Sequence, residues 1–406
     1  MKKITLIFTL LIAIAMNSNA QWTLQTSGKT NDLLSAYFID ANNGYVVGAD
    51  DGMGSGGMIL KTTNGGTNWT AQVSNTYNIL NSVHFTDVNT GYIAGGSGTI
   101  LKTINGGTNW TALTTNATAN LKSISFSSAT TAYVVGSGGT IIKTTNSGTD
   151  WTPQTSGKTS ILNSVTFINT TTGFIVGDSG TILKTINGGT NWTIQNSGLT
   201  GSSNNLNSVY FTDVNTGYAV GQSGKIIKTT NGGTTWVAQT SGLTNDIFSV
   251  YFVNANTGYA VGWTKVLKTT NGGSTWTIQS SGISGTYDNL NSVFFIDANT
   301  GYTVGNKGRI LKTTNGGGVG IEENHPAIAA RIYPNPASDF LSIDLQNISN
   351  SGVKLNVYNV VGELLKSEII SRNQDRVNIQ DLANGLYVVT LESNNAKATQ
   401  KLLIQR

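Results

Sequence analysis

Paired carboxyl groups are the first candidates for chemistry, because a glycoside hydrolase needs two of them, one acting as acid and one as base or nucleophile. The region from residue 21 to 320 contains no Glu and eleven Asp. Five of these occupy repeated turn or hairpin positions and are interpreted as turn formers: Asp40, Asp87, Asp150, Asp213 and Asp297. Six others lie in loops that we expect to share one face: Asp32, Asp50, Asp51, Asp178, Asp246 and Asp288. A catalytic Asp pair among these six remains an alternative, which loss of hydrolysis in Asp178→Asn or in Asp51→Asn would support.

Metal and redox chemistry have little support in the sequence. Cysteine is absent, and the two histidines, His84 and His325, are too few for a zinc or iron site. His84 occupies a position that holds Tyr in other repeats, which favours a packing role. Asp50 and Asp51 could offer oxygens to Ca²⁺, but no other ligands can be identified, so a solvated acidic loop is preferred. We therefore expect no cofactor and no metal.

A repeated unit organises most of the chain. An Asn that opens a glycine-rich turn recurs at intervals of 40 to 44 residues, and a Gly-Tyr pair or its variant precedes each one. The seven turn residues are Asn64, Asn105, Asn146, Asn187, Asn231, Asn271 and Asn315. Short apolar runs separated by Asn and Gly turns predict antiparallel hairpins. In one repeat the four expected strands are 207–211, 217–221, 225–230 and 236–240.

A four-stranded unit cannot bury both of its faces alone, so neighbouring units must stack, as in a propeller or a solenoid. The last repeat lacks its fourth strand, while the segment from residue 21 to 28 resembles a surplus one. We expect Trp22 and its strand to pair with residues 310–314 and complete the seventh blade. In an open solenoid, the fourth strand of the last repeat would not be placed at the start of the chain. The sequence therefore predicts a closed seven-bladed β-propeller over residues 21–317.

The turn Thr229-Thr-Asn-Gly-Gly-Thr-Thr-Trp236 resembles the Asp-box, or BNR, hairpin, with Asn in place of Asp. With the Gly-Tyr strands, the array is similar to the photosystem II assembly and stability factor family of seven-bladed propellers. That resemblance implies fold more than function, because Asp-box propellers include hydrolases, receptors and assembly factors. Sialidases among them bind the substrate carboxylate with several arginines, whereas Arg309 is the only Arg between residues 21 and 320.

Function in a repeat protein concentrates where the repeat is broken. The broken loops carry the candidate binding residues Asp50, Asp51, Tyr77, Asp178, Trp263, Tyr287 and Arg309. Aromatic and Arg side chains are typical anchors of interfaces. The competing interpretation is that these loops vary because variation there is tolerated.

One lysine recurs in each third strand: Lys61, Lys102, Lys143, Lys184, Lys228, Lys268 and Lys312. A basic ring is one interpretation. We prefer a simpler one, in which each lysine keeps a strand edge soluble and discourages pairing between sheets. The net charge of +4 is spread thinly, so no nucleic-acid partner is expected.

The two ends of the chain predict export. Residues 1–20 combine two lysines, an apolar run and small residues at Ser18 and Ala20, which is typical of a secretory signal peptide. After a linker at 318–330, residues 331–406 alternate short strands and turns, which predicts a small immunoglobulin-like β-sandwich.

This last segment resembles the type A C-terminal sorting domain of the Bacteroidetes type IX secretion system. The matching residues are Pro334, Asn335, Pro336, Gly362, Gly385, Tyr387 and Lys401. The resemblance implies that the type IX machinery is a partner and that the protein reaches the outer-membrane surface or the medium. We expect a monomeric, non-enzymatic scaffold that binds a protein or a glycan. A secreted polysaccharide-active glycoside hydrolase is the alternative.

Overall fold

The computed structural model describes residues 22–49, 57–199, 203–283, 285, 288–318, 329–346, 353–359, 363–370, 376–393 and 396–406. The chain divides into two compact units, residues 1–320 and 321–406. The expected signal peptide lies outside the described residues. None of the described residues belongs to a helix with the length and apolarity needed to cross a bilayer.

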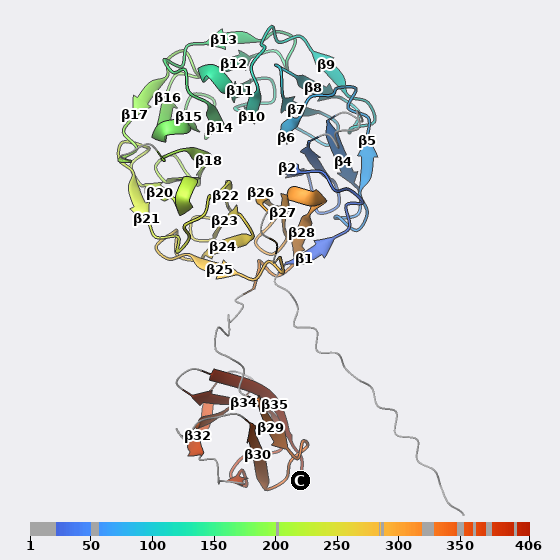
Figure 1. Cartoon of the computed structure of the whole chain (residues 1–406), viewed down its shortest axis with the longest axis vertical. Helices are drawn as coiled ribbons and strands as arrows, with labels where there is room; N and C mark the ends of the chain where they lie inside the picture. Colours follow the sequence, from blue (N-terminus) through green and yellow to red (C-terminus); the bar gives the residue numbers. More distant parts are fainter. Residues whose placement is uncertain are drawn as a thin grey trace, which may run out of the picture. The chain divides into compact units, whose positions relative to one another are not determined.

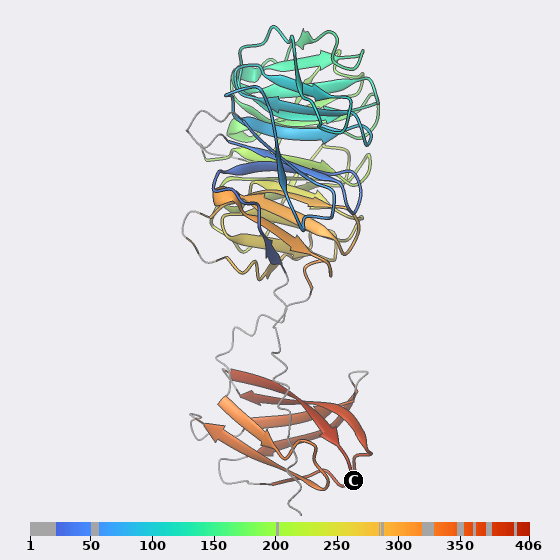
Figure 2. The same cartoon turned by 90° about the vertical axis from the view of Figure 1, so that its right-hand side faces the viewer.

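Within the described part of the first unit, seven four-stranded antiparallel sheets are arranged around a centre (Figures 1 and 2). We number the blades by their innermost strands. These are β2 (Leu33–Phe38), β6 (Leu80–Phe85), β10 (Leu121–Phe126), β14 (Leu162–Phe167), β18 (Leu206–Phe211), β22 (Ser249–Phe252) and β26 (Leu290–Phe295). The second strands are β3 (Gly44–Gly48), β7 (Gly91–Gly95), β11 (Ala132–Gly136), β15 (Gly173–Gly177), β19 (Gly217–Gly221), β23 (Gly258–Gly262) and β27 (Gly301–Gly305).

The third strands are β4 (Met58–Thr62), β8 (Ile100–Thr103), β12 (Ile141–Thr144), β16 (Thr181–Thr185), β20 (Ile226–Thr229), β24 (Lys265–Thr269) and β28 (Ile310–Thr313). The outermost strands are β5 (Thr70–Gln72), β9 (Thr111–Leu113), β13 (Thr152–Gln154), β17 (Thr193–Gln195), β21 (Val237–Gln239), β25 (Thr277–Gln279) and β1 (Thr23–Gln25). The expected second strand is observed at the expected bounds. The outermost strands are shorter than expected, because the Trp that precedes each one packs between blades, buried in five blades and partly buried in blades one and four.

The N-terminal strand closes the ring. β1 pairs antiparallel with β28, joining Thr23 to Lys312, Leu24 to Leu311 and Gln25 to Ile310. Trp22 is buried and packs edge-on against Tyr259 of blade six and Phe295 of blade seven. The predicted all-β propeller with closure by the N-terminal strand is therefore confirmed.

The core of the ring lies between adjacent blades. Each second strand is buried along its whole length, and its Tyr or Phe contacts the Phe that ends the innermost strand of the next blade. The glycine that begins each second strand, except Ala132 in blade three, makes room for the Phe of its own blade, since a Cβ at Gly44 would overlap the Phe38 ring. This close approach explains the Gly-Tyr motif.

The turn between the third and fourth strands is held by its own side chains. In blade five the buried Thr229 hydroxyl accepts a hydrogen bond from the Gly233 amide (2.9 Å) and donates to the Asn231 side chain (3.0 Å). The Asn231 carbonyl oxygen accepts from the Thr235 amide (2.9 Å). Asn thus serves as the turn-forming residue of the Asp-box.

The second unit is a sandwich of two sheets in its described residues. One contains β29 (Ala329–Tyr333), β30 (Phe340–Gln346) and β33 (Val377–Asn378). The other contains β32 (Leu364–Ile370), β31 (Val353–Tyr358), β34 (Gly385–Ser393) and β35 (Ala396–Ile404). Buried Leu, Ile and Val side chains fill the space between the sheets. β29 begins at Ala329, within the segment expected to be a linker.

Candidate functional site

In the described residues, connections between second and third strands lie beside the loops that lead to the next blade, on one face of the propeller. Backbone amides in the connections between second and third strands donate to side chains in the loops that lead to the next blade. Ser179 donates to Asn205 (3.1 Å), Ser223 to Asp246 (2.9 Å) and Lys307 to Asp32 (3.1 Å). We call this surface the variable face. Its loops are joined by hydrogen bonds, so the residues they carry are held in place.

Two of the predicted binding residues are exposed aromatic side chains on this face. Tyr77 is 77% exposed and Trp263 is 37% exposed. Tyr77 follows Thr76, whose carbonyl accepts from the Gly57 amide (2.6 Å). The predicted residues Asp50, Asp51 and Tyr287 lie outside the described residues.

Trp263 lies in an unusual backbone conformation. The connection in blade six is a two-residue turn between Gly262 and Lys265, and Trp263 adopts a φ of 40° there. The described equivalent connections place small or flexible residues at positive φ: Ser97, Gly138, Ser179, Ser223 and Lys307. A positive φ is rare for a bulky side chain and costs about 1–3 kcal/mol. The Leu290 amide donates to the Trp263 carbonyl (2.9 Å), which fixes the turn.

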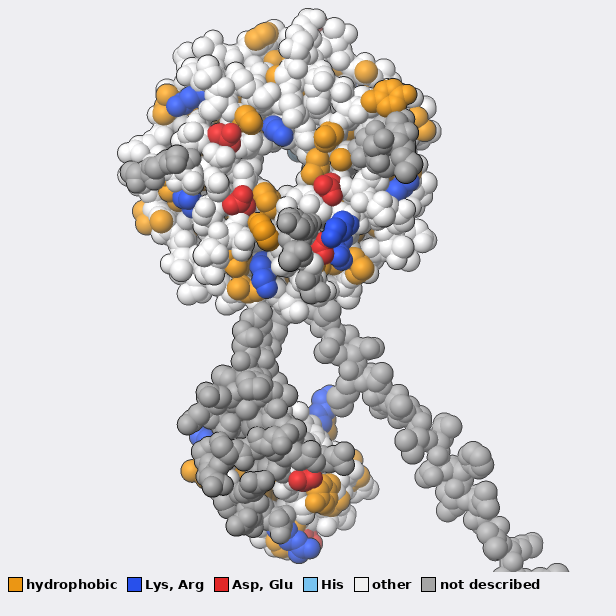
Figure 3. Space-filling view, in the orientation of Figure 1, with side chains coloured by type: hydrophobic (Ala, Val, Ile, Leu, Met, Phe, Trp, Pro, Cys, Tyr) orange, Lys and Arg blue, Asp and Glu red, His pale blue; other side chains and the backbone are white. Residues whose placement is uncertain are grey.

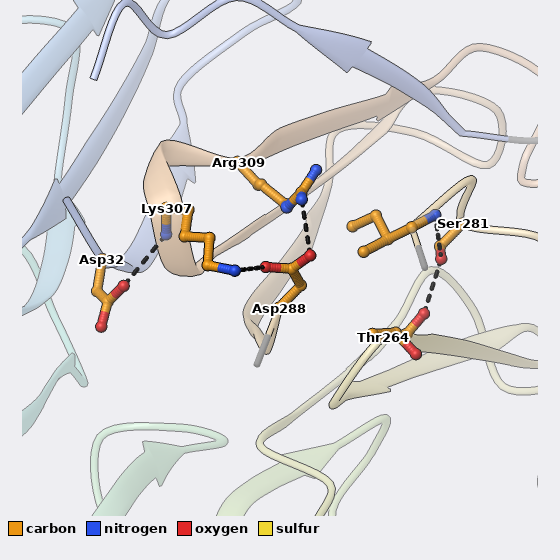
Figure 4. Close-up of polar contacts among 7 residues, drawn as sticks. Asp32, Thr264, Ser281, Asp288, Lys307 and Arg309 are labelled. Carbon is orange, nitrogen blue, oxygen red and sulfur yellow. Dashed lines mark hydrogen bonds and ion pairs between the residues drawn. The ribbon is translucent and has the colours of Figure 1, made fainter. Parts of the chain in front are cut away.

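Arg309 forms an ion pair with Asp288, a buried loop carboxylate that was not among the predicted binding residues (Figure 4). Its Nη2 lies 2.7 Å from Oδ2 of Asp288, and Lys307 Nζ lies 2.8 Å from Oδ1. The Asp288 side chain is 2% exposed, and the Arg309 side chain is 28% exposed. The hydrogen bond from Lys307, and then that from Arg309, lower the pKa of Asp288 against the opposing effect of burial. Arg309 therefore helps to fix the loop before blade seven.

Asp178 also connects neighbouring blades. It begins the single turn η2 (Asp178–Gly180) and is only partly exposed. Its Oδ1 accepts a hydrogen bond from Asn163 Nδ2 (2.9 Å), which also donates to the Leu206 carbonyl of blade five (3.0 Å). Asp32 and Asp246 accept backbone hydrogen bonds, as described above. Each described carboxylate of the variable face thus positions a loop. No cluster of three potential metal-ligating side chains occurs among the described residues.

The repeated lysines have a role that the sequence did not reveal. In each blade the Lys Nζ donates to a turn carbonyl of the next blade at 2.6–2.9 Å, as Lys61 does to Gly106. The same carbonyl accepts the Tyr45 hydroxyl in blade one (2.6 Å). Each Nζ also lies 5.3–5.6 Å from the centroid of the adjacent Tyr or Phe ring. The expected role at a soluble strand edge is therefore wrong, because the lysines join neighbouring blades.

The sorting-domain residues converge around the last strand. Asn335 Nδ2 donates to the Lys401 carbonyl (2.8 Å), and Asn335 Oδ1 accepts from the Leu403 amide (2.9 Å). Pro334 and Pro336, on either side of Asn335, follow cis peptide bonds. The Tyr387 hydroxyl donates to the Ala383 carbonyl (2.8 Å) beside Gly385. Gly362 lies outside the described residues.

Comparison with known proteins gives a family for each unit. The family model described as "Photosynthesis system II assembly factor YCF48" matches residues 74–156, 143–241 and 199–280, which together make about half of the chain. The model described as "Secretion system C-terminal sorting domain" matches residues 331–405.

Solved structures share the fold. YCF48 bound to D1 peptide is 21% identical with a TM-score of 0.61, covering 76% of this chain and all of that one. YCF48 from Cyanidioschyzon merolae is 19% identical with a TM-score of 0.59, covering 72% of this chain and 98% of that one. The extracellular domain of the putative one component system BT4673 from B. thetaiotaomicron is 13% identical with a TM-score of 0.55, covering 93% of this chain and 58% of that one.

A curated relative shares a shorter region. The endo-acting ulvan lyase of Formosa agariphila is 36% identical over 80 residues, which are 18% of this chain and 14% of that enzyme. The chain therefore spans only a small part of that relative's length. Because the propeller model covers about half of the sequence, the chain belongs to the YCF48 family of propellers, joined here to a sorting domain that directs it through type IX secretion to the cell surface or the extracellular space.

Proposed function

We propose that the protein is a non-enzymatic scaffold that acts outside the cell and binds a protein or a glycan through the variable face. The observation that carries this proposal is the conformation of Trp263. A bulky aromatic residue at a φ of 40° destabilises the fold. Because Trp263 is 37% exposed, its packing offsets only part of this destabilisation. Exposed Trp and Tyr side chains supply large contact areas and dominate binding energies.

The carboxylates of the face support binding over hydrolysis. Asp32, Asp178, Asp246 and Asp288 each hold a loop or a neighbouring side chain by hydrogen bonds or ion pairs. A general acid needs a raised pKa, whereas the pKa of Asp288 is lowered. One of the similar solved structures is YCF48 bound to D1 peptide, so a propeller of this fold can hold a peptide.

A matched pair of variants tests the proposal in the full chain. In Trp263→Gly the aromatic ring is removed, and the positive φ no longer costs energy because glycine adopts it without strain. In Ser223→Gly the positive φ of blade five is relieved in the same way, but no aromatic ring is lost. Both proteins would be applied to an array of soluble polysaccharides and synthetic peptides. We expect the wild type and Ser223→Gly to bind the same members, and Trp263→Gly to lose them while its stability is unchanged or about 1 kcal/mol higher. Unchanged binding by Trp263→Gly would refute the proposal.

A secreted polysaccharide-active enzyme is the second candidate, favoured by the partial match to the ulvan lyase. It would use a pair of loop carboxylates, with Asp51 and Asp178 as the predicted candidates. New reducing ends released from a polysaccharide panel, and lost in Asp178→Asn, would establish this candidate in place of the scaffold.

A further inference from the structure

The central opening of the propeller is lined by an unequal set of side chains. The penultimate position of the innermost strand holds Tyr37, His84, Ser125, Thr166, Tyr210, Tyr251 and Phe294 in blades one to seven. All seven are partly exposed, although they belong to the strands nearest the centre (Figure 1). The space-filling view shows an opening there (Figure 3). Their exposed atoms therefore face the central channel.

Five of these side chains form a continuous series of rings. Adjacent ring centroids lie 5.1 Å apart for Tyr210 and Tyr251, 5.3 Å for Tyr251 and Phe294, 5.1 Å for Phe294 and Tyr37, and 4.9 Å for Tyr37 and His84. The contact between Phe294 and Tyr37 crosses the seam between the last blade and the first.

A sixth ring joins the series because of one substitution. Ala132 replaces the glycine that begins the second strand in the other blades. Phe126 is tilted by 46° at 4.8 Å from Tyr92, whereas Tyr133 and Phe167 at the next junction stack at 17° and 3.9 Å. Phe126 instead stacks on His84 at 5.0 Å and 20°. We name these six residues the channel arc: Tyr210, Tyr251, Phe294, Tyr37, His84 and Phe126.

The arc breaks a symmetry that its neighbours keep. Two positions earlier, every blade has a Ser, and each Ser hydroxyl accepts a hydrogen bond from an innermost-strand amide of the next blade, as Ser35 does from Val83 (3.3 Å). One position later, every blade has a Phe. Those uniform positions serve packing, and Phe126 of blade three, which is tilted away from Tyr92, is the one of these side chains that we count in the arc. The arc position instead places rings on one side of the channel and the small hydroxyl residues Ser125 and Thr166 on the other.

The chemistry of this wall selects the class of ligand. Burial, and then the nearby phenols of Tyr210 and Tyr37, raise the pKa of Tyr251, so the three tyrosines stay neutral at ordinary pH. Burial lowers the pKa of His84 to about 4, so its imidazole is neutral as well. A charged ligand would find no opposite charge among the arc residues. A purely apolar one would cover three phenol hydroxyls without offering them hydrogen bonds.

We propose that the channel arc with Ser125 and Thr166 is a binding site for a neutral, hydroxyl-rich ligand, namely a sugar residue of an uncharged oligosaccharide. The rings supply apolar surface for the C–H groups of a pyranose, and the hydroxyls on both sides of the channel exchange hydrogen bonds with the sugar hydroxyls. This site is separate from the variable face and does not depend on binding there.

Calorimetric titration of the full chain tests the site. The probes are neutral hexasaccharides of glucose, mannose and xylose, with a hexagalacturonate as the charged counterpart. We expect at least one neutral probe to bind and the charged one not to bind. Tyr210→Phe with Tyr251→Phe keeps the rings and removes two hydroxyls, and should weaken binding roughly tenfold.

Two further variants control for indirect effects. Thr166→Tyr places a ring on the open side of the channel and should abolish binding. Tyr218→Phe removes a phenol hydroxyl that donates to the Gly272 carbonyl between blades, and should leave the affinity unchanged. No binding of any neutral probe, or binding that survives Thr166→Tyr, would overturn the proposal. Binding lost in Trp263→Gly but kept in Thr166→Tyr would place the sugar on the variable face.

Discussion

Phe174→Tyr should make the propeller more stable. At this position six blades have Tyr, and the hydroxyl donates to a turn carbonyl of the next blade at 2.6–2.9 Å. Blade four has Phe174 instead, so the Gly232 carbonyl accepts the Lys184 ammonium (2.6 Å) without a phenol beside it. The Phe174 ring stacks on Phe211 at 4.0 Å and 19°, close to the 3.9 Å and 17° of Tyr133 on Phe167. A hydroxyl added to Phe174 would therefore reach the Gly232 carbonyl.

The expected gain follows from the value of one buried hydrogen bond. A net contribution of about 1 kcal/mol is usual, and the lower end of about 0.5 kcal/mol applies here because the carbonyl already accepts a charged donor. Urea unfolding followed by Trp fluorescence would measure it, since Trp236 packs beside Phe211 at 6.0 Å.

Two controls bracket this prediction. Tyr133→Phe removes the equivalent bond to the Gly188 carbonyl (2.7 Å), which also accepts the Lys143 ammonium, and should cost about 0.5 kcal/mol. Phe252→Tyr adds a hydroxyl to a ring that is 2% exposed and should destabilise the protein. If Phe174→Tyr lowered the free energy of unfolding while Tyr133→Phe left it unchanged, the phenol hydroxyls would not join the blades as we describe.

His84 and Asn335 give two further predictions. Because burial lowers the pKa of His84 from 6.5 to about 4, the unfolded chain binds a proton there more readily, so stability should fall by roughly 3 kcal/mol as the pH drops from 6.5 to 4. His84→Tyr should remove this part of the pH dependence of urea unfolding; identical profiles for the two proteins would contradict it. Asn335→Ala should destabilise the sorting domain by about 1–3 kcal/mol and reduce the exported fraction in cell fractionation, whereas Asn68→Ala in the propeller should not. If the Asn335→Ala protein were destabilised but exported normally, the hydrogen bonds of Asn335 to Lys401 and Leu403 would not be needed for sorting.

The repeat made the fold predictable from the sequence. Asn and Gly turns at regular intervals mark the strands, and the surplus segment after Trp22 indicates how the ring closes. The second strands lie at the expected bounds because Gly and Tyr define both their start and their packing. The outermost strands were overestimated, because the repeat does not show that each Trp leaves the ladder to enter the core.

The contacts between blades could not be predicted from one repeat. Lys61 bonds to Gly106, 45 residues away, and the same lysine is equally consistent with a solvent-facing edge when only its own strand is considered. Asp288 resembled any loop carboxylate, since its partners Lys307 and Arg309 follow an intervening hairpin. The conformation of Trp263 could have been inferred from the sequence, because the connection in blade six is too short to leave Trp263 outside the tight turn. The sequence correctly indicated that His84 packs in the protein. The channel arc could not be predicted in the same way, because its rings come from different blades and meet only when the propeller is closed.

Closure of the ring by the N-terminal strand is the central structural claim, and a disulfide tests it most directly because the chain has no cysteine of its own. Thr23 and Lys312 are directly paired across β1 and β28, so cysteines at these positions lie at a distance that a disulfide can span. Thr23→Cys with Lys312→Cys should cross-link under mild oxidation, as shown by mass spectrometry of the non-reduced peptides. The control Thr23→Cys with Lys61→Cys uses the equivalent lysine of blade one, which pairs with Thr70, and should stay reduced. A cross-link to residue 61 and none to residue 312 would contradict the closed ring.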